Sequence, residues 1–210
     1  MTRHGEEWLE GDHAASYLER ADGIPHRHEG EATLVELLPQ RVRRVLDLGT
    51  GDGRLLAIVL AEHPDAEAVG VDFSAPMLNA ARERLGGRAS LVEHDLSRPL
   101  PALGGRFDAV VSSFAIHHLP DDRKRDLYAE VFDHLEAGGV FSNLEHVASP
   151  TETLQEEFHE AIGLPRDHGD DSNQLVPVEE QLIWLRGIGY TDVDCLWKWR
   201  ELALLHGRRA

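Results

Sequence analysis

Cysteine and basic residues are both scarce in this 210-residue sequence. Cys195 is the only cysteine, so no disulfide can form within these residues, and its alternating apolar surroundings favour buried strand packing over a nucleophile. The 21 Lys and Arg residues are outnumbered by 38 Asp and Glu, which gives a formal net charge of −17. Such a surface repels nucleic acids and anionic membranes. We therefore expect a small-molecule substrate as the partner, and neither a nucleic acid nor a membrane.

Long apolar runs are also absent. The longest, residues 55–61, is far shorter than the roughly 20 residues that a membrane-spanning helix needs. The first seven residues lack the apolar stretch of a signal peptide. These features predict a cytoplasmic protein, whereas the sequence does not specify an oligomeric state.

Strand-like and helix-like patterns alternate along most of the chain. The predicted strands are residues 43–48, 68–71, 90–93, 107–112 and 139–144, and the predicted helices are 54–63, 74–84 and 121–135, the last stopped by Gly138 and Gly139. Strand–helix repetition with short connections predicts a parallel sheet with helices on both faces.

The end of the chain follows a different pattern. A predicted helix at 178–186 precedes two strand-like runs, 191–196 and 201–206, joined by only a few residues. This proximity predicts an antiparallel hairpin at the sheet edge. The Asp-, Gly- and Asn-rich segment 164–174 is expected to be a mobile loop over the site.

A glycine loop is the strongest motif. The run Val45-Leu-Asp-Leu-Gly-Thr-Gly-Asp-Gly-Arg54 places a strand, a tight turn and a helix start in succession. Glycines allow a sharp turn and a close approach of backbone to ligand. Asp72 ends the second predicted strand, where an acid can accept hydrogen bonds from both hydroxyls of a ribose. Together these features predict a nucleoside-binding site.

The same loop argues against a dinucleotide. The dinucleotide fingerprint needs Gly or Ala at its sixth place, and Arg54 stands there, which disfavours an NAD-dependent oxidoreductase. Asp47 and Asp52 would repel a pyrophosphate but would suit a sulfonium cation. We therefore expect a nucleoside that carries a positive charge.

Five segments, taken together, resemble class I S-adenosylmethionine-dependent methyltransferases. They are residues 45–54, 69–77, 92–96, 107–114 and 135–140, in the family's order and spacing, and the resemblance covers about residues 40–145. It implies an α/β, Rossmann-like, seven-stranded and mostly parallel sheet of order 3-2-1-4-5-7-6, with the last strand antiparallel and helices on both faces. The predicted terminal hairpin agrees with that order.

The resemblance also implies which residues bind S-adenosyl-L-methionine. The assignments are Asp47, Gly49, Thr50 and Gly51 to the methionine end, Asp72 to the ribose, Phe73 and Met77 to the border of the adenine, Asp95 and the Leu96 amide to the adenine amino group, and Ser113 to the neighbourhood of the sulfonium. Two of them have simpler explanations: Met77 as core packing and Asp95 as the cap of a turn before Pro99.

Candidate acceptor-side residues follow the fourth and fifth strands. His117 and His118 follow the fourth, and Glu145 and His146 follow the fifth, so all four would face the methyl donor at the carboxyl edge of the sheet. Imidazole has a pKa suited to proton transfer near neutrality, which makes these residues candidates for a base or for orienting the substrate. The alternative for His118 is packing beneath the loop with a bond to a backbone carbonyl. Their spacing matches no familiar metal site, so no metal is expected.

The first forty residues resemble the N-terminal helical lid of many small-molecule methyltransferases, ahead of a donor-binding domain at 41–210. In such a lid Tyr17 would cover the donor, and Arg27 would pair with its carboxylate through a bidentate contact. The alternative for Arg27 is a surface position. Trp197 and Trp199 either form an aromatic wall of the acceptor site or pack against neighbouring helices.

These features predict methyl transfer from S-adenosyl-L-methionine to O, N or C of a small-molecule acceptor. Ser112-Ser-Phe-Ala115 stands where enzymes that methylate DNA-base amines carry an Asp/Asn-Pro-Pro-Tyr motif, so those substrates are disfavoured. Two alternatives remain open. One is an enzyme that modifies the donor, because residues 197–201 resemble the ending of carboxy-S-adenosylmethionine synthases. The other is a non-catalytic, donor-binding scaffold.

Overall fold

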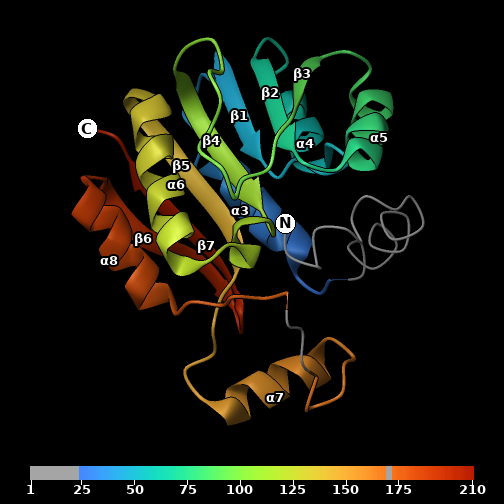
Figure 1. Cartoon of the computed structure of the whole chain (residues 1–210), viewed down its shortest axis with the longest axis vertical. Helices are drawn as coiled ribbons and strands as arrows, with labels where there is room; N and C mark the ends of the chain where they lie inside the picture. Colours follow the sequence, from blue (N-terminus) through green and yellow to red (C-terminus); the bar gives the residue numbers. More distant parts are fainter. Residues whose placement is uncertain (1–23, 169–171) are drawn as a thin grey trace.

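Seven strands form one sheet in the computed structural model, which describes residues 24–168 and 172–210 (Figure 1). The strands are β1 (Arg44–Leu48), β2 (Glu67–Asp72), β3 (Ala89–Glu93), β4 (Phe107–Ser113), β5 (Leu135–His146), β6 (Thr191–Trp199) and β7 (Leu202–Arg208). Their order is β3-β2-β1-β4-β5-β7-β6. The first five strands run parallel, whereas β7 is antiparallel to both of its neighbours. The predicted order and the terminal hairpin are therefore confirmed.

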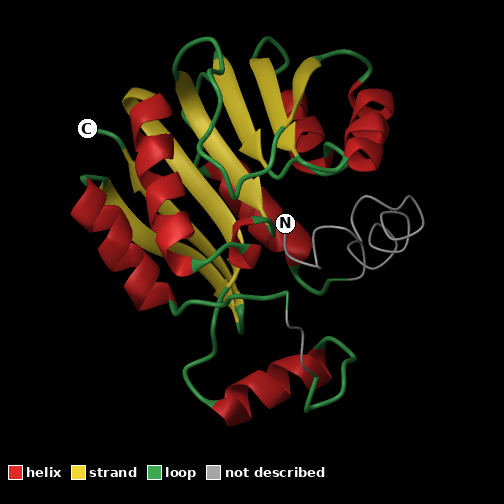
Figure 2. Cartoon of the chain, in the orientation of Figure 1, coloured by secondary structure: helices red, strands yellow, loops and turns green. Residues whose placement is uncertain are grey.

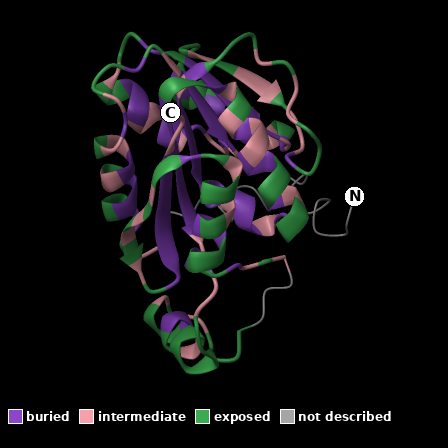
Figure 3. Ribbon diagram, turned by 90° about the vertical axis from the view of Figure 1, so that its left-hand side faces the viewer, coloured by how far each residue is buried: buried purple, intermediate pink, exposed green. Residues whose placement is uncertain are grey.

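Helices cover both faces of this sheet (Figure 2). One layer contains α3 (Arg27–Glu36), α4 (Arg54–Glu62) and α5 (Ala75–Leu85), and the other contains α6 (Asp121–His134) and α8 (Val178–Ile188). Adjacent strand residues point to opposite faces. Accordingly, Val110 packs in the core cluster that holds Leu127 of α6, whereas Val111 packs in the cluster that holds Leu56 of α4. The central strands of the sheet are thus buried between two apolar layers, whereas the edge strands β3 and β6 are partly exposed (Figure 3).

The start of β5 differs from the sequence prediction. The helix α6 ends at His134, one residue before its predicted end, whereas β5 begins at Leu135, four residues before the predicted start of that strand. Leu135 takes extended backbone, pairs with Phe107 of β4 and is fully buried. Burial of this side chain outweighs its helical propensity, and Gly138 (φ 80°) then turns the chain within the irregular start of β5.

A helix that the sequence analysis did not predict follows β5. This helix, α7 (Glu152–Ala161), lies apart from the sheet layers (Figure 1). Its buried residues are Phe158 and His159, and Thr151 caps its N-terminus by accepting a bond from the Leu154 amide. The predicted loop at 164–174 has no helix or strand in its described part. Within the described ranges, no helix is long and apolar enough to cross a membrane.

Candidate active site

The glycine loop turns tightly at the end of β1. The amides of Gly49 and Thr50 both donate to the carbonyl of Val71, at 2.8 and 2.9 Å, which joins the loop to β2. Gly49 and Gly51 have φ values of 71° and 53°. A Cβ at Gly49 would lie 2.1 Å from the Cβ of Ala115, whereas no described atom lies within 4 Å of a Cβ built at Gly51. Gly49 is therefore required for packing, and Gly51 presents backbone to open space.

Asp72 lies at the tip of β2, beside this loop. Its Oδ2 accepts from the Gly51 amide at 2.9 Å, and its Oδ1 accepts from the Ser74 amide at 2.8 Å. Burial raises the pKa of the carboxyl, and these backbone bonds oppose the rise. Each carboxylate oxygen has two acceptor sites, so both oxygens can accept a further bond. This is the acceptor arrangement expected for a ribose.

Asp47 is buried beneath the loop. Its Oδ2 accepts from the Thr50 hydroxyl at 2.8 Å, and its Oδ1 has no hydrogen-bond partner among the described residues. The pKa of Asp47 is raised to about 7, chiefly by burial and also by the charge of Asp72, against the lowering effects of the Thr50 bond and of the charge of Arg27. An unsatisfied buried oxygen is costly, so a ligand that donates here would be stabilised. The Ser113 Oγ is likewise buried without a partner in the described part of the chain.

The residues assigned to the adenine lie after β2, on α5 and after β3. Met77 and Leu96 are buried, and Phe73 and Asp95 are half-buried. The Asp95 Oδ1 accepts from the Ser97 amide at 2.8 Å, so this carboxylate does cap the turn. That bond uses only one acceptor site of the Asp95 carboxylate, so a bond from the adenine amino group stays a prediction. The assignments of Phe73, Met77 and Leu96 to the adenine also stay predictions.

Arg27 is buried, so its surface alternative is wrong. Its Nε donates to the Glu31 Oε1 at 2.8 Å, and its guanidinium lies 5.3 Å from the ring centre of Phe114. Phe114 directly follows β4 and has a φ of 54°. Tyr17 lies outside the described residues. Its role and that of residues 1–40 as a lid remain predictions.

His117 and Glu145 form a buried pair across β4 and β5. The His117 Nδ1 lies 2.6 Å from the Glu145 Oε1, which also accepts from the His146 amide at 3.0 Å. The Asn143 amide donates to the Glu145 Oε2 at 3.4 Å. Burial raises the pKa of Glu145 to about 7, although these bonds and the neighbouring charges of His118 and His146 lower it. The arrangement fixes the orientation of the His117 ring.

The other two histidines have different partners. The His146 Nε2 lies 2.7 Å from the Oε2 of Glu201, which is fully buried, and its ring meets that of His117 edge-on at 5.6 Å. The His118 Nδ1 lies 3.1 Å from the Ser172 carbonyl oxygen, which is the packing alternative stated above. Sequence reasoning missed Glu201 as a partner, because the β5–β7 register that aligns the two strands is not visible in a sequence.

The two tryptophans of β6 pack against neighbouring helices. A Cβ at Gly30 of α3 would lie 3.1 Å from the Trp197 ring, and the Trp199 ring lies 6.0 Å from Phe158 of α7 and 4.5 Å from His26. These contacts account for both aromatic side chains by packing. Among the residues that the structure describes, no group of three or more His, Cys, Asp or Glu is placed to hold a metal ion.

The sheet order and the glycine loop define a Rossmann-like fold of the class I methyltransferase type. Residues 45–139 match the family model described as a methyltransferase domain. The demethylmenaquinone methyltransferase of Roseiflexus castenholzii is 32% identical over 123 residues, 59% of this chain and 50% of that protein. The trans-aconitate 2-methyltransferase of Deinococcus radiodurans is 32% identical over 176 residues, 79% of this chain and 65% of that protein.

Solved structures share the same fold. DesVI of Streptomyces venezuelae has a TM-score of 0.70 at 22% identity, over 94% of this chain and 98% of that one. Human N-acetylserotonin methyltransferase in complex with SAM has a TM-score of 0.70 at 14% identity, over 96% of this chain and 57% of that one. The family-model match over residues 45–139, the methyltransferase relatives and the shared fold support a class I S-adenosylmethionine-dependent methyltransferase. The chain spans 40% to 51% of the length of three demethylmenaquinone methyltransferases that it matches.

The two loop glycines should respond differently to alanine. Each substitution places a side chain at positive φ, which costs roughly 1–2 kcal/mol. Gly49→Ala adds the clash with Ala115, so we expect it to lose about 1–3 kcal/mol more of the unfolding free energy than Gly51→Ala, measured in urea. Equal losses in the two variants would contradict the packing described for Gly49.

The buried Asp47 should make stability fall as pH rises. Its pKa is raised to about 7 in the folded state, so between pH 5 and pH 7 the folded chain holds a proton that the unfolded chain has released. Relative to Asp47→Asn, the wild type should lose about 3 kcal/mol of unfolding free energy between pH 5 and pH 8. Urea unfolding across this range measures the difference. Asp65→Asn, at an exposed position, serves as control. The prediction would be refuted if the unfolding free energies of Asp47→Asn and of the wild type changed with pH in parallel.

Proposed function

We propose that this chain transfers a methyl group from S-adenosyl-L-methionine to O, N or C of a small-molecule acceptor. The observation that carries the proposal is the Asp72 carboxylate, which accepts from the Gly51 amide while Gly51 itself faces open space. A glycine backbone leaves room for a nucleoside sugar, and the fixed carboxylate beside it can accept hydrogen bonds from the sugar hydroxyls. The relatives named for demethylmenaquinone and trans-aconitate support a small acceptor.

Unsatisfied polar atoms fit the rest of the donor. The Oδ1 of Asp47, which has no partner among the described residues, would accept from the donor's ammonium group, and the buried hydroxyl of Ser113 would lie near the sulfonium. Phe73, Met77, Asp95 and the Leu96 amide would enclose the adenine. When bound, the donor supplies an electrophilic methyl group, so the protein's task is to align the acceptor with it.

His117 is the residue that we assign to proton removal from the acceptor. Glu145 binds its Nδ1, so the basic atom of the neutral ring is Nε2. The carboxylate orients the ring and stabilises the imidazolium that forms when a hydroxyl or amine proton is taken. His146, held by Glu201 and edge-on to the His117 ring, would orient the acceptor, whereas His118 bonds the Ser172 carbonyl of the loop.

Removing the Asp72 carboxylate should abolish most donor binding. Asp72→Ala deletes acceptors for the two ribose hydroxyls, so we expect an affinity for S-adenosylmethionine at least about tenfold lower by calorimetry. Glu93→Ala is the matched control, because Glu93 pairs with Asp72 in register at the tip of β3 but is exposed. Undiminished affinity in Asp72→Ala would refute the site.

Replacing His117 should slow the reaction without weakening donor binding. With an acceptor that must lose a proton, found by screening hydroxyl and amine compounds, His117→Asn should lower kcat by about 10²-fold or more, while the dissociation constant for the donor stays the same. His63→Asn, at the far end of α4, controls for loss of a histidine. An unchanged kcat in His117→Asn would exclude this residue as the base.

A further inference from the structure

A buried lysine lies near the start of α6. Lys124 is 1% exposed, although lysine is among the residues that are least often fully buried. Its Nζ donates to the Asp121 Oδ1 at 3.1 Å and to the main-chain carbonyl of Gln174. The pKa of Lys124 is lowered, chiefly by burial, against the raising effects of the Asp121 bond and of the charges of Asp121 and Glu145. The ammonium therefore acts on the carboxylate that binds His117.

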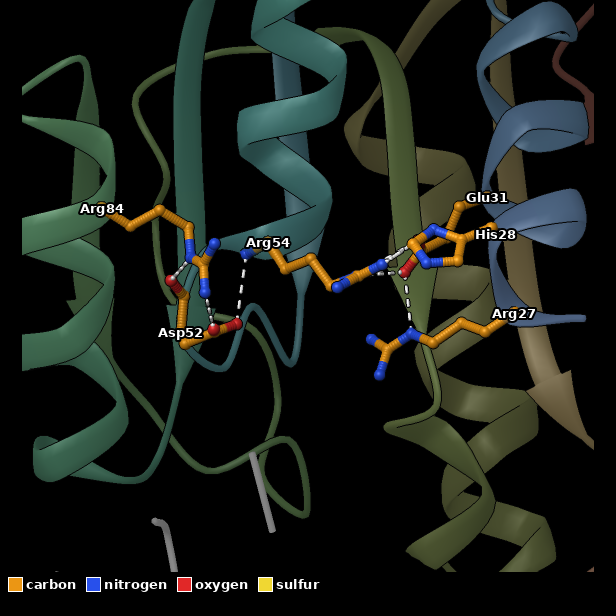
Figure 4. A network of polar contacts seen from close by, with 6 residues as sticks. All are labelled: Arg27, His28, Glu31, Asp52, Arg54 and Arg84. Atoms are coloured by element: carbon orange, nitrogen blue, oxygen red, sulfur yellow. Dashed lines mark hydrogen bonds and ion pairs between the residues drawn. The ribbon is translucent and has the colours of Figure 1, made fainter. Parts of the chain in front are cut away.

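The ion pair with Asp121 does not account for this burial. The Asp121 side chain is 51% exposed, so a lysine at the surface could make the same bond without leaving water. Other buried charges are satisfied by charges: the Glu31 Oε1 accepts from the Nε atoms of Arg27 and Arg54, at 2.8 and 3.0 Å (Figure 4). Lys124 differs, because the further partner that its buried position reaches is a main-chain carbonyl.

Gln174 links this lysine to the proposed base. Its carbonyl accepts from Lys124, and its amide donates to the His117 carbonyl at 2.9 Å. Two residues further along, the Val176 carbonyl accepts from the Ala148 amide at 3.1 Å, just after β5. The segment that contains Gln174 thus joins the start of α6 and the end of β5 to the turn that carries His117.

The turn that carries His117 depends on bonds from outside. It is a 3-10 helix of three residues, η1 (Ile116–His118), and it closes on an internal bond of 3.0 Å from the Leu119 amide to its first carbonyl. A short 3-10 turn has poorer hydrogen-bond geometry than an α-helix, so external bonds matter for how firmly its backbone is held. The Gln174 amide bonds the backbone of this turn, and Glu145 bonds the ring of His117.

We propose that Lys124 is a positioning residue for the acceptor side, which holds the backbone of His117 through Gln174. The inference rests on the proposed function, because it takes His117 as the base. Without the ammonium, the Gln174 carbonyl loses this donor, and the bond from the Gln174 amide to His117 opens more often. The base is then aligned with the acceptor for a smaller share of the time, whereas the donor site around Asp72 is held by other bonds.

Amide exchange measures this hold directly. In Lys124→Met, which keeps an unbranched side chain and removes the ammonium, we expect the Gln174 amide to exchange with solvent about tenfold faster, measured by NMR. The Gly49 amide, which donates to the Val71 carbonyl at 2.8 Å, should exchange at its wild-type rate because the effect is local. An unchanged Gln174 amide would overturn the inference. Equal acceleration of both amides would also overturn it, since Lys124 would then only support the fold.

Turnover tests the consequence for the reaction. With an acceptor that must lose a proton, Lys124→Met should lower kcat about tenfold, while the dissociation constant for S-adenosylmethionine stays the same. Faster exchange at Gln174 with an unchanged kcat would overturn the positioning role. A wild type that binds no donor would overturn the proposed function itself, and the exchange rates would still decide whether Lys124 holds the backbone of His117.

Arg125→Met is the matched control, because Arg125 is the next residue of α6, loses the same charge and is exposed. Asp121→Asn removes the ion pair but keeps the bond from Lys124 to Gln174. Neither variant should change the exchange of the Gln174 amide or kcat. An effect of Asp121→Asn as large as that of Lys124→Met would overturn the assignment to the carbonyl bond.

Lys124→Gln provides the test if Lys124→Met does not fold. It keeps an N–H donor but is one atom shorter, so it cannot reach both Asp121 and the Gln174 carbonyl at their present positions. We expect a smaller acceleration at the Gln174 amide, again without a change at Gly49. A Gln174 amide that exchanges at the wild-type rate would overturn the inference here as well.

Discussion

The bond from the Gly51 amide to the Asp72 carboxylate is the interaction on which the rest of the site depends. It joins the turn after β1 to the tip of β2, and the amides of Gly49 and Thr50 strengthen that junction through the Val71 carbonyl. Because the loop is held from β2, its glycine backbone can stay open on the other side. The same carboxylate thus shapes the loop and is the group that we propose as the acceptor for the donor's ribose.

Buried acids at the carboxyl edge of the sheet are the second constraint. Burial raises the pKa of Asp47 and of Glu145 to about 7, so at neutral pH each sits near its own titration point. Glu31 and Glu201 are equally buried but are held by arginines and by His146. Buried carboxylates without full compensation lower stability, which is the usual cost of a polar site that is kept ready for a ligand.

Local patterns were sufficient for most of the fold. Apolar runs and glycine breaks located all seven strands, and the resemblance to class I methyltransferases implied the sheet order that the structure shows. The errors came where tertiary burial overrides local preference. β5 begins at Leu135, which pairs with Phe107, although a glycine pair interrupts the strand pattern there, and α7 buries only Phe158 and His159.

The sequence by itself determined the order of the elements, the glycine loop and which residues stand at strand ends, because these follow from chain-local periodicity and backbone sterics. Only the tertiary structure decided the partners. His117 meets Glu145 across 28 positions, Arg54 meets Glu31 across 23, and His146 meets Glu201 across 55. Such pairs form because strand register and helix packing bring distant side chains within hydrogen-bond distance, and neither is encoded in any short stretch of chain.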